Sequence, residues 1–568
     1  MRITAAVLVL IVAAVAAAGS AAKSKPKPPP SAAQHLSQIK HIVVIYEENH
    51  SFDNLYGGWE GVDGLSKADQ AHTTQVDQAG APLACLPQND VNLTVPPLTA
   101  SCNATSAFKN SPFLIDQFIP ASATTCPKPV GAFAAHGFLN GTGLPGGCTE
   151  DIVHRYYQEQ YQLDGGKQDR YATGSDAVGL VMGHYDTKSL PIYQYLHGKN
   201  APHYAIDDRF FQGAFGGSFL NHQILVAATA PVWKNADNAG DANDFHSVVD
   251  ANGFPNNYPL YTSPLGTKVI DSMETASCSP PAGRPATPAG VTCGDFAVNT
   301  TQPFYQPYSP GTADARRLPP LTSANIGDEL SAKGVDWAWY SGGWSNADGD
   351  VGAPGWTNGN GPSCSDRQAN PKSTYPNCPD VDFQFHHQAF NYWASYAPGT
   401  AARKTHLLDE SEFFSVAQSS TKSACNLKQV SFVKPLGEEN EHPGYASESA
   451  GSNHLVELLR SIEGSACAKD TMVVVTYDEF GGQWDHVPPP GQGSATPGPH
   501  DQWGPGTRIP ALVLAPNLPG KFVVDHTEHD TTSILSTIEH RFGVAALTNR
   551  DRTVPDLSSA WKAKVVAK

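Results

Sequence analysis

The sequence predicts an α/β fold with a central, mostly parallel β-sheet flanked by helices. Two short apolar runs, residues 42–45 and Thr471–Tyr477, have the β-branched composition and length of buried strands. Between and beyond them, segments of helical periodicity alternate with other strand-like runs along the chain. That alternation is typical of a sheet whose parallel strands are connected by helices.

The remaining predicted elements follow from periodicity and from glycine stops. Gly334 and Gly543 are each expected to end a helix, and the Gly165-Gly166 pair ends the helical segment that begins at Asp151. Further helices are predicted at residues 189–196, 218–228, 323–333, 405–418, 452–464 and 531–542, and further strands at 335–340, 429–433 and 508–515.

Composition limits the possible functions. With 568 residues, of which 40% are hydrophobic and 16% charged, the chain can bury a large core. The formal net charge of -17 argues against a general nucleic-acid binder, which would usually present a basic surface. No nucleic-acid binding is therefore expected, although a local basic pocket stays possible.

The N-terminal residues are typical of an exported protein. Residues 1–22 carry an early Arg2, an apolar centre and a small-residue end, which favours a secretory signal peptide over a membrane anchor. Residues 23–30 are Lys/Pro-rich and are predicted to be extended, and the linker segment as a whole is expected to cover residues 23–37. The mature chain, with one domain over residues 38–562, is expected to be periplasmic or extracellular without a stable membrane anchor.

Ten cysteines follow the predicted signal peptide, and an even number in an exported chain predicts disulfides whose pairing the sequence leaves open. None forms a CxxC motif, so a zinc knuckle is not expected. Two loop-rich segments, about 81–147 and 232–380, are predicted to be disulfide-stapled insertions. The second is interrupted by the predicted helix 323–333 and strand 335–340.

Polar residues follow both of the buried strands. Glu48 and Asn49 come after the first strand, and Asp478 and Glu479 come directly after the second. Ligands of open α/β sheets sit at the carboxyl ends of strands, so these oxygen donors could hold a hard cation. The alternative is that Glu48 is a solvated acid and Asn49 a turn residue. Ser51 is a plausible N-cap for the segment that follows.

Ser218 is the candidate nucleophile. Two glycines precede it, and the apolar periodicity after it places it at or near a helix N-terminus. Such a position offers unpaired N–H groups and a positive dipole end to an anion, and the glycines allow close approach. The alternative, that Ser218 merely caps the helix, stays open.

Histidines recur at element ends. His154 is expected in the first turn of the helix after Asp151, where a surface or capping role is the alternative, and His442 follows the strand at 429–433. His386 and His387, if on a strand, would face opposite ways, so at most one need reach a site. With a serine and several acids, and without a G-x-S-x-G elbow, the set fits phosphoester hydrolysis better than acyl transfer.

The segments EENHSFDNLYG, GGSFLNH, HHQAF, EHPGYA and TYDEFGGQWDHV resemble the bacterial phosphoesterase family that includes secreted acid phosphatases and phospholipases C. The matches occur in order from residue 40 to about 545. The resemblance implies an alkaline-phosphatase-like core and a single phosphoesterase catalytic domain over residues 38–562.

The resemblance also implies the site residues. Its metal-binding set matches Glu48, Asn49, Ser218, Asp478 and Glu479, with Ser218 also the nucleophile. The histidines around the phosphate or leaving group match His154, His386, His387 and His442, with the choice between His386 and His387 open. One divalent ion is expected, with Ca²⁺, Mg²⁺, Mn²⁺, Zn²⁺ and Fe all possible. Asp485 and His486 are interpreted as supports that orient the loop after the second strand.

The sequence therefore predicts an exported, metal-dependent phosphoric ester hydrolase that acts on a phosphate ester substrate through a phosphoserine intermediate. An acid phosphatase is favoured, because the chain stops soon after the last predicted core helix, whereas longer phospholipases C carry additional C-terminal domains. The first alternative is a phospholipase C that cleaves phosphodiester head groups. A non-catalytic exported binding protein is the remote alternative, and it predicts the loss of a nucleophile or acid that this chain retains. The oligomeric state stays open.

Overall fold

The computed structural model describes residues 30–88, 101–102, 107–117, 149–233, 245–266, 272–280, 282–283, 285–309, 311–356, 383–444, 446–492 and 498–566. The predicted signal peptide and the first part of the predicted linker lie outside these residues. Helix α1 (Ala32–Gln38) occupies the last part of that linker, and Ser31 and Gln34 form a capping box at its start.

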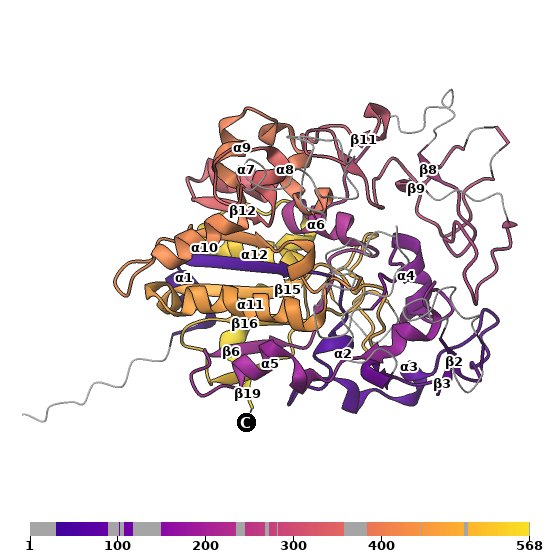
Figure 1. Cartoon of the computed structure of the whole chain (residues 1–568). Coiled ribbons are helices and arrows are strands. Elements are labelled where there is room, and N and C mark those ends of the chain that lie inside the picture. The colour runs from indigo at the N-terminus through magenta and orange to yellow at the C-terminus, as the bar shows by residue number, and fades with distance from the viewer. Residues whose placement is uncertain are drawn as a thin grey trace, which may run out of the picture.

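The central sheet has nine strands within the described residues, in the order β13-β12-β14-β1-β15-β16-β6-β17-β19. Five neighbouring pairs are parallel and three are antiparallel, which confirms the predicted mostly parallel α/β sheet. Figure 1 labels β12, β15, β16, β6 and β19 of this sheet, one below another in that order. In sheet order they are β13 (Leu407–Asp409), β12 (Trp337–Ser341), β14 (Val430–Lys434), β1 (His41–Glu47), β15 (Thr471–Tyr477), β16 (Ala511–Leu514), β6 (Tyr204–Asp207), β17 (Phe522–Asp525) and β19 (Lys564–Val565).

The two strands predicted to be buried are neighbours in the middle of the sheet. They are parallel and in register, with His41 opposite Thr471 and Glu47 opposite Tyr477. Every residue of β15 is buried, which explains its continuous apolar sequence, because helices cover both faces of a parallel sheet. The polar residues that follow both strands therefore leave the sheet at the same edge.

Two groups of helices cover the faces of the sheet (Figure 1). Helix α6 packs against α7 and α12, whereas α11 packs against α5 and α10. Their bounds are α5 (Pro191–Leu196), α6 (Ser218–Ala227), α7 (Ile326–Ala332), α10 (Glu410–Ser419), α11 (Glu448–Glu463) and α12 (Thr532–Phe542). Shorter helices are α2 (Phe52–Leu55), α3 (Gln70–Thr73), α4 (Tyr156–Leu163), α8 (Trp344–Asp348), α9 (Ala401–His406) and α13 (Asn549–Thr553).

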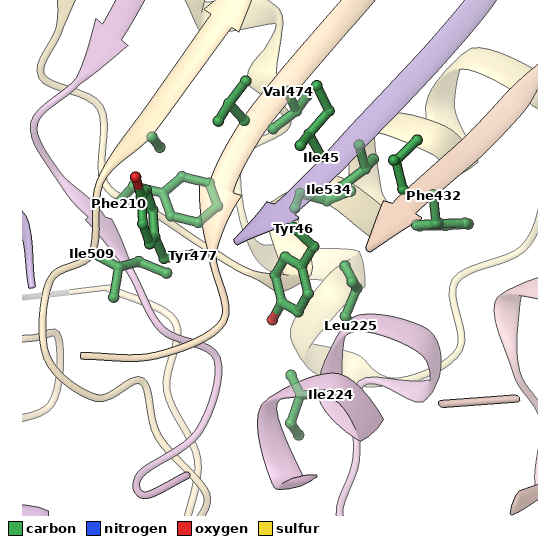
Figure 2. Packing of buried hydrophobic residues seen from close by; sticks show 14 of the residues in the cluster. Ile45, Tyr46, Phe210, Ile224, Leu225, Phe432, Val474, Tyr477, Ile509 and Ile534 are labelled. Atoms are coloured by element: carbon green, nitrogen blue, oxygen red, sulfur yellow. The ribbon is translucent and has the colours of Figure 1, made fainter. Parts of the chain in front are cut away.

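The core joins the sheet to α6 and α12. Figure 2 shows Tyr46 of β1 lying against Ile224 and Leu225 of α6, with Ile534 of α12 close to Phe432 of β14. All five side chains are buried. Full burial of a large apolar side chain stabilises a fold by roughly 1.5–3 kcal/mol. This packing fixes the N-terminus of α6 relative to the end of β1.

The loop-rich insertions lie to the right of the sheet in Figure 1, around the labels β2, β3, β8 and β9. Disulfides Cys85–Cys102 and Cys278–Cys293 link parts of them, and Cys425–Cys467 joins the loop before β14 to the segment after α11. The other four cysteines lie outside the described residues. The minor strands are β2 (Leu86–Pro87), β3 (Ala107–Phe108), β4 (Phe113–Leu114), β5 (Gly183–His184), β7 (Phe210–Phe211), β8 (His246–Ser247), β9 (Glu274–Ala276), β10 (Gln302–Pro303), β11 (Arg317–Leu318) and β18 (His529–Asp530).

Two local predictions differ from the structure. Residues 405–418 are not one helix, because residues 407–409 form edge strand β13 between α9 and α10. Asp409 ends that strand and also caps α10, accepting a hydrogen bond from Ser411 N. The helix predicted after Asp151 begins only at Tyr156, so His154 precedes it rather than lying in its first turn.

Candidate active site

Five of the predicted site residues meet at the carboxyl edge of the sheet. Glu48 and Asn49 follow β1, Asp478 and Glu479 follow β15, and Ser218 is the first residue of α6. All five are at most 4% exposed. Ser218 Oγ lies 3.1 Å from Glu48 Oε2, 3.3 Å from Asn49 Oδ1 and 3.4 Å from Glu479 Oε1.

The Ser218 hydroxyl does not cap its helix. The N-cap of α6 is Gly217, and it makes no side-chain cap hydrogen bond. The hydroxyl carries one proton but faces three acceptor oxygens, so its proton cannot satisfy them all. The alternative that Ser218 merely caps the helix is therefore wrong. A bound cation would interact favourably with the oxygen lone pairs that the single hydroxyl proton leaves unsatisfied.

Asn49 is both a turn residue and a member of the site. Its φ of 61° lies in the left-handed region, which costs energy for a residue other than glycine and is found at functional positions. Its backbone N–H donates to Asp478 Oδ1 at 3.1 Å. Gly481 packs on it so closely that an added Cβ would lie 2.2 Å from Asn49 O. The loops after β1 and β15 thus hold each other in place.

A buried acid of α4 holds the glycine turn before Ser218. Gly216 N donates to Glu159 Oε2 at 2.6 Å, and Gln212 Nε2 donates to the same oxygen at 2.8 Å. Gly216 has a φ of 86°, and an added Cβ would lie 2.5 Å from Tyr156 N. Burial raises the pKa of Glu159 to about 7. Sequence reasoning missed Glu159, because a lone acid in a helix carries no signal of such a contact.

Two of the four predicted histidines surround the Asn49 amide. Asn49 Nδ2 lies 3.0 Å from His442 Nε2 and 3.3 Å from His154 Nε2. His442 Nδ1 donates to Pro443 O at 2.7 Å, which leaves its Nε2 as an acceptor in the neutral ring. His154 Nε2 also lies 3.2 Å from Glu479 Oε1.

The other two predicted histidines, His386 and His387, lie in a 3-10 helix, Phe385–His387, and not in a strand. His387 is 4% exposed, and its Nε2 lies 3.2 Å from Glu48 Oε1. His386 is partly exposed and interacts electrostatically with His154 and Lys434. Burial lowers the pKa of His386 to about 3 and that of His387 well below its usual range. Both rings are thus neutral here, and His387 is the one that contacts an acid of the site.

Sequence reasoning missed two further residues that touch the site. Lys434, the last residue of β14, is fully buried, contacts Glu48 Oε1 and donates to Tyr46 O at 2.9 Å. His222 lies one turn after Ser218, and its Nδ1 is 2.7 Å from Ser218 O. Its ring stacks on His387 with the centroids 4.9 Å apart. Lys434 was recognisable only as a charge at the end of a predicted strand.

The site holds more negative than positive charge. Burial and Asp478 raise the pKa of Glu48 to about 8, and burial raises that of Asp478 to about 6. Burial and Asp478 also raise the pKa of Glu479. Asp478 Oδ2 is buried without a hydrogen-bond partner. Three carboxylates, a carboxamide oxygen and a hydroxyl are the donors that a hard divalent cation prefers, so these residues fit the predicted metal.

Asp485 and His486 connect the two loops that carry the site. Asp53 N donates to Asp485 Oδ2 at 3.0 Å, and His486 N donates to Asp53 Oδ2 at 2.9 Å. Arg508 is fully buried between the two acids, 3.1 Å from Asp485 Oδ1 and 3.1 Å from Asp53 Oδ1. These contacts agree with the predicted supporting role.

The fold and the site together define a class of protein. A serine hydroxyl among oxygen ligands, at the carboxyl edge of a mostly parallel sheet, suits metal-assisted cleavage of an ester. A model of the Phosphoesterase family matches residues 39–545, and the chain belongs to that family.

Curated relatives match a smaller part of the chain. The chain is similar to phospholipase C B of Mycobacterium tuberculosis strain H37Rv, with 36% identity over 155 residues, covering 24% of this chain and 29% of the relative. It is also similar to non-specific phospholipase C6 of Arabidopsis thaliana, with 29% identity over 138 residues, covering 21% and 26%. The chain thus spans less than a third of the length of these relatives.

Among solved structures, the chain is similar to a protein in the alkaline phosphatase superfamily from Vibrio parahaemolyticus, at 14% identity and a TM-score of 0.21. That match covers 41% of this chain and 51% of the other. None of the helices in the described part of the chain is long and apolar enough to cross a membrane.

Proposed function

We propose that the protein is an exported, metal-dependent phosphoric ester hydrolase that cleaves phosphomonoesters through a phosphoserine at Ser218. The observation that carries the proposal is the Ser218 hydroxyl, which caps nothing and lies among the oxygens of Glu48, Asn49 and Glu479. Membership of the Phosphoesterase family supports the choice of ester.

In the first step, Ser218 Oγ attacks phosphorus in line with the departing alcohol. The Oγ–P bond forms, the bond between phosphorus and the alcohol oxygen breaks, and the serine proton passes to a neighbouring base. Water then attacks the phosphoserine and releases phosphate and the serine. A divalent cation held by Glu48, Asn49, Ser218, Asp478 and Glu479 would supply positive charge that favours the serine alkoxide and offsets charge on the phosphoryl oxygens.

The histidines have two tasks in this scheme. His442 and His154 direct Nε2 toward Asn49 at the centre of the site, where a protonated ring can donate to the departing alcohol. His387 lies beside Glu48, and the ring of His386 lies 4.5 Å from that of His387. Neutral rings there can donate hydrogen bonds to phosphoryl oxygens without adding charge.

The second candidate is a phospholipase C that cleaves a phosphodiester head group. It is favoured by the names of the relatives that match this chain, which include phospholipases C of Mycobacterium tuberculosis and Arabidopsis thaliana. Both candidates use the same serine and the same oxygen ligands. They differ only in whether the transferred phosphoryl group carries a second ester.

The test compares the turnover of a chromogenic phosphomonoester with that of a phosphocholine diester by purified mature protein, before and after chelation and metal restoration. Metal-dependent preference for the monoester supports the phosphatase. Preference for the diester makes the protein a phospholipase C, and inactivity on both with every metal supports the binding-protein alternative. Export is tested separately, by mass spectrometry of the protein found in the periplasm or the medium. An exported protein should be found there without residues 1–22.

Two serine variants test the nucleophile in the same assay. Ser218→Ala should remove nearly all turnover and leave folding intact, because the hydroxyl is not a cap. Ser31→Ala is the matched control, since Ser31 caps α1 through a capping box remote in sequence from the site. It should lower stability slightly and leave turnover unchanged. Substantial turnover by Ser218→Ala would move the nucleophile elsewhere.

A further inference from the structure

Glu47, the residue before the proposed metal ligand Glu48, is a buried acid without a hydrogen-bond partner. It ends β1, is 0% exposed, and neither of its carboxylate oxygens has a hydrogen-bond partner. An isolated buried carboxylate is costly unless it is paired, protonated or bound to a metal.

Strand geometry gives the direction of Glu47. Successive side chains of a strand point to opposite faces, and Tyr46 points to α6 (Figure 2). Its ring lies 5.0 Å from that of His222 in the same helix. Glu47 therefore faces the side covered by α10 and α11. Its carboxylate interacts electrostatically with Lys434 and His454, which favour its charge, and with Glu410 and Glu48, which oppose it.

Glu410 and His454 belong to a compact set of ligand atoms. Glu410 is the first residue of α10, His454 lies in α11, and Glu439 lies in the loop between β14 and α11. His454 Nε2 lies 2.9 Å from Glu410 Oε1 and 3.7 Å from Glu439 Oε2. One ligand atom from each of the three residues lies within 4.8 Å of the others.

The spacing suits a small divalent cation. Nitrogen and oxygen ligands lie about 2.0–2.2 Å from Zn²⁺, which places tetrahedral ligands roughly 3.4 Å from one another. The two measured separations lie on either side of that value. An imidazole with carboxylates favours Zn²⁺ over Ca²⁺, which takes oxygen ligands. The Glu439 side chain is 42% exposed, so an ion could enter from solvent.

We propose that Glu410, Glu439 and His454, with Glu47 behind them, form a second divalent-cation site of the Zn²⁺ type. It lies on the face of the sheet covered by α10 and α11 and is separate from the site at Ser218. An ion there would compensate the charge of Glu47 and tie α10 to α11. The competing occupant is a proton, with His454 charged and paired to Glu410 and with Glu47 held neutral.

The test counts zinc ions in the mature protein by mass spectrometry of the metal after equilibrium dialysis against ZnCl₂. Asp478→Asn with Glu479→Gln removes ligands of the first site, and about one ion per chain should remain bound. Adding Glu439→Gln should weaken that binding at least tenfold, because it removes one of the three proposed ligands, whose side chain is 42% exposed. Zn²⁺ should raise the melting temperature of the first variant but not of the second.

Glu457→Gln is the matched control, because Glu457 is an exposed acid of the same helix as His454. It should leave zinc binding unchanged. The proposal is overturned if no zinc remains after the first site is removed, or if the remaining zinc is insensitive to Glu439→Gln. If the first variant does not fold, the wild-type protein is compared with Glu439→Gln alone. An equal zinc content in these two proteins also overturns the proposal.

Discussion

The loops after β1 and β15 carry two buried polar clusters that contrast in how their charge is balanced. The first, the reactive cluster, consists of Glu48, Asp478 and Glu479 with Lys434. The second, the bracing cluster, consists of Asp53 and Asp485 with His486 and Arg508. The acids of both clusters follow β1 or β15, whereas Lys434 ends β14, and both clusters are almost fully buried. Only the bracing cluster satisfies its own charges.

In the bracing cluster, Arg508 donates to Asp53 and Asp485 and also to the backbone oxygens of Asp63 and Asp208, at 2.6 and 2.9 Å. The reactive cluster has three carboxylates, one lysine and a buried Asp478 oxygen without a hydrogen bond. In a buried network that only supports structure, each charge is paired with an opposite charge or a hydrogen bond. The unpaired negative charge of the reactive cluster therefore distinguishes it from the bracing cluster.

The largest expected effect is the loss of activity when an acid of the reactive cluster is neutralised. Asp478→Asn should lower kcat/KM by about 10²–10³-fold or more, because it removes charge-stabilising oxygen from the reacting centre. Its melting temperature should stay close to that of the wild type, since Asp478 Oδ2 makes no hydrogen bond that the amide would lose. Steady-state kinetics and thermal melting measure both. A variant that unfolds but stays active would reverse the contrast.

The next effect should appear in stability. Arg508→Met leaves Asp53 and Asp485 buried without their cation, which should lower the free energy of unfolding by about 3–5 kcal/mol. Urea denaturation measures the change, and Arg552→Met, at an exposed arginine of α13, is the control. If Arg508→Met and the control were equally stable, the bracing cluster would have no structural role.

The bracing cluster should also make stability depend on pH. Burial opposes the charge on His486, but Asp53 and Asp63 outweigh it and raise the pKa of His486 to about 9. Because the unfolded ring titrates near 6.5, the stabilisation is complete below about pH 6.5 and is lost as pH rises through 9, by up to about 3 kcal/mol. Urea denaturation from pH 6 to 9.5 should show a shallower decline for His486→Gln. An unchanged slope would contradict this assignment.

Lys434 tests the charge balance of the reactive cluster itself. Three carboxylates, one divalent cation and Lys434 sum to zero, so Lys434→Met should leave a net negative charge facing a phosphate ester. We expect kcat/KM to fall about tenfold through a higher KM, with the metal content retained. Steady-state kinetics gives KM, and analysis of the bound metal shows whether the variant has lost its cation. An unchanged KM would show that Lys434 only positions Glu48.

Much of the fold could be predicted because buried strands and amphipathic helices have local patterns. The strand Thr471–Tyr477 was predicted with its observed bounds, and Gly543 ends α12 in the left-handed conformation as expected. Residues 405–418 are not the single helix that their pattern predicts, because β13, only three residues long, lies between two helices. A strand that short has no period of its own, and it exists because it pairs with β12.

The sequence by itself determined where the chain carries acids, the serine and the histidines relative to strand ends and a helix start. Only the tertiary structure decided what each polar side chain does. It showed that Ser218 faces oxygens instead of capping α6, and that Lys434 neutralises part of the charge. Apolar periodicity records burial along one segment. The role of a charge depends on partners from distant segments, and these meet only in the folded chain.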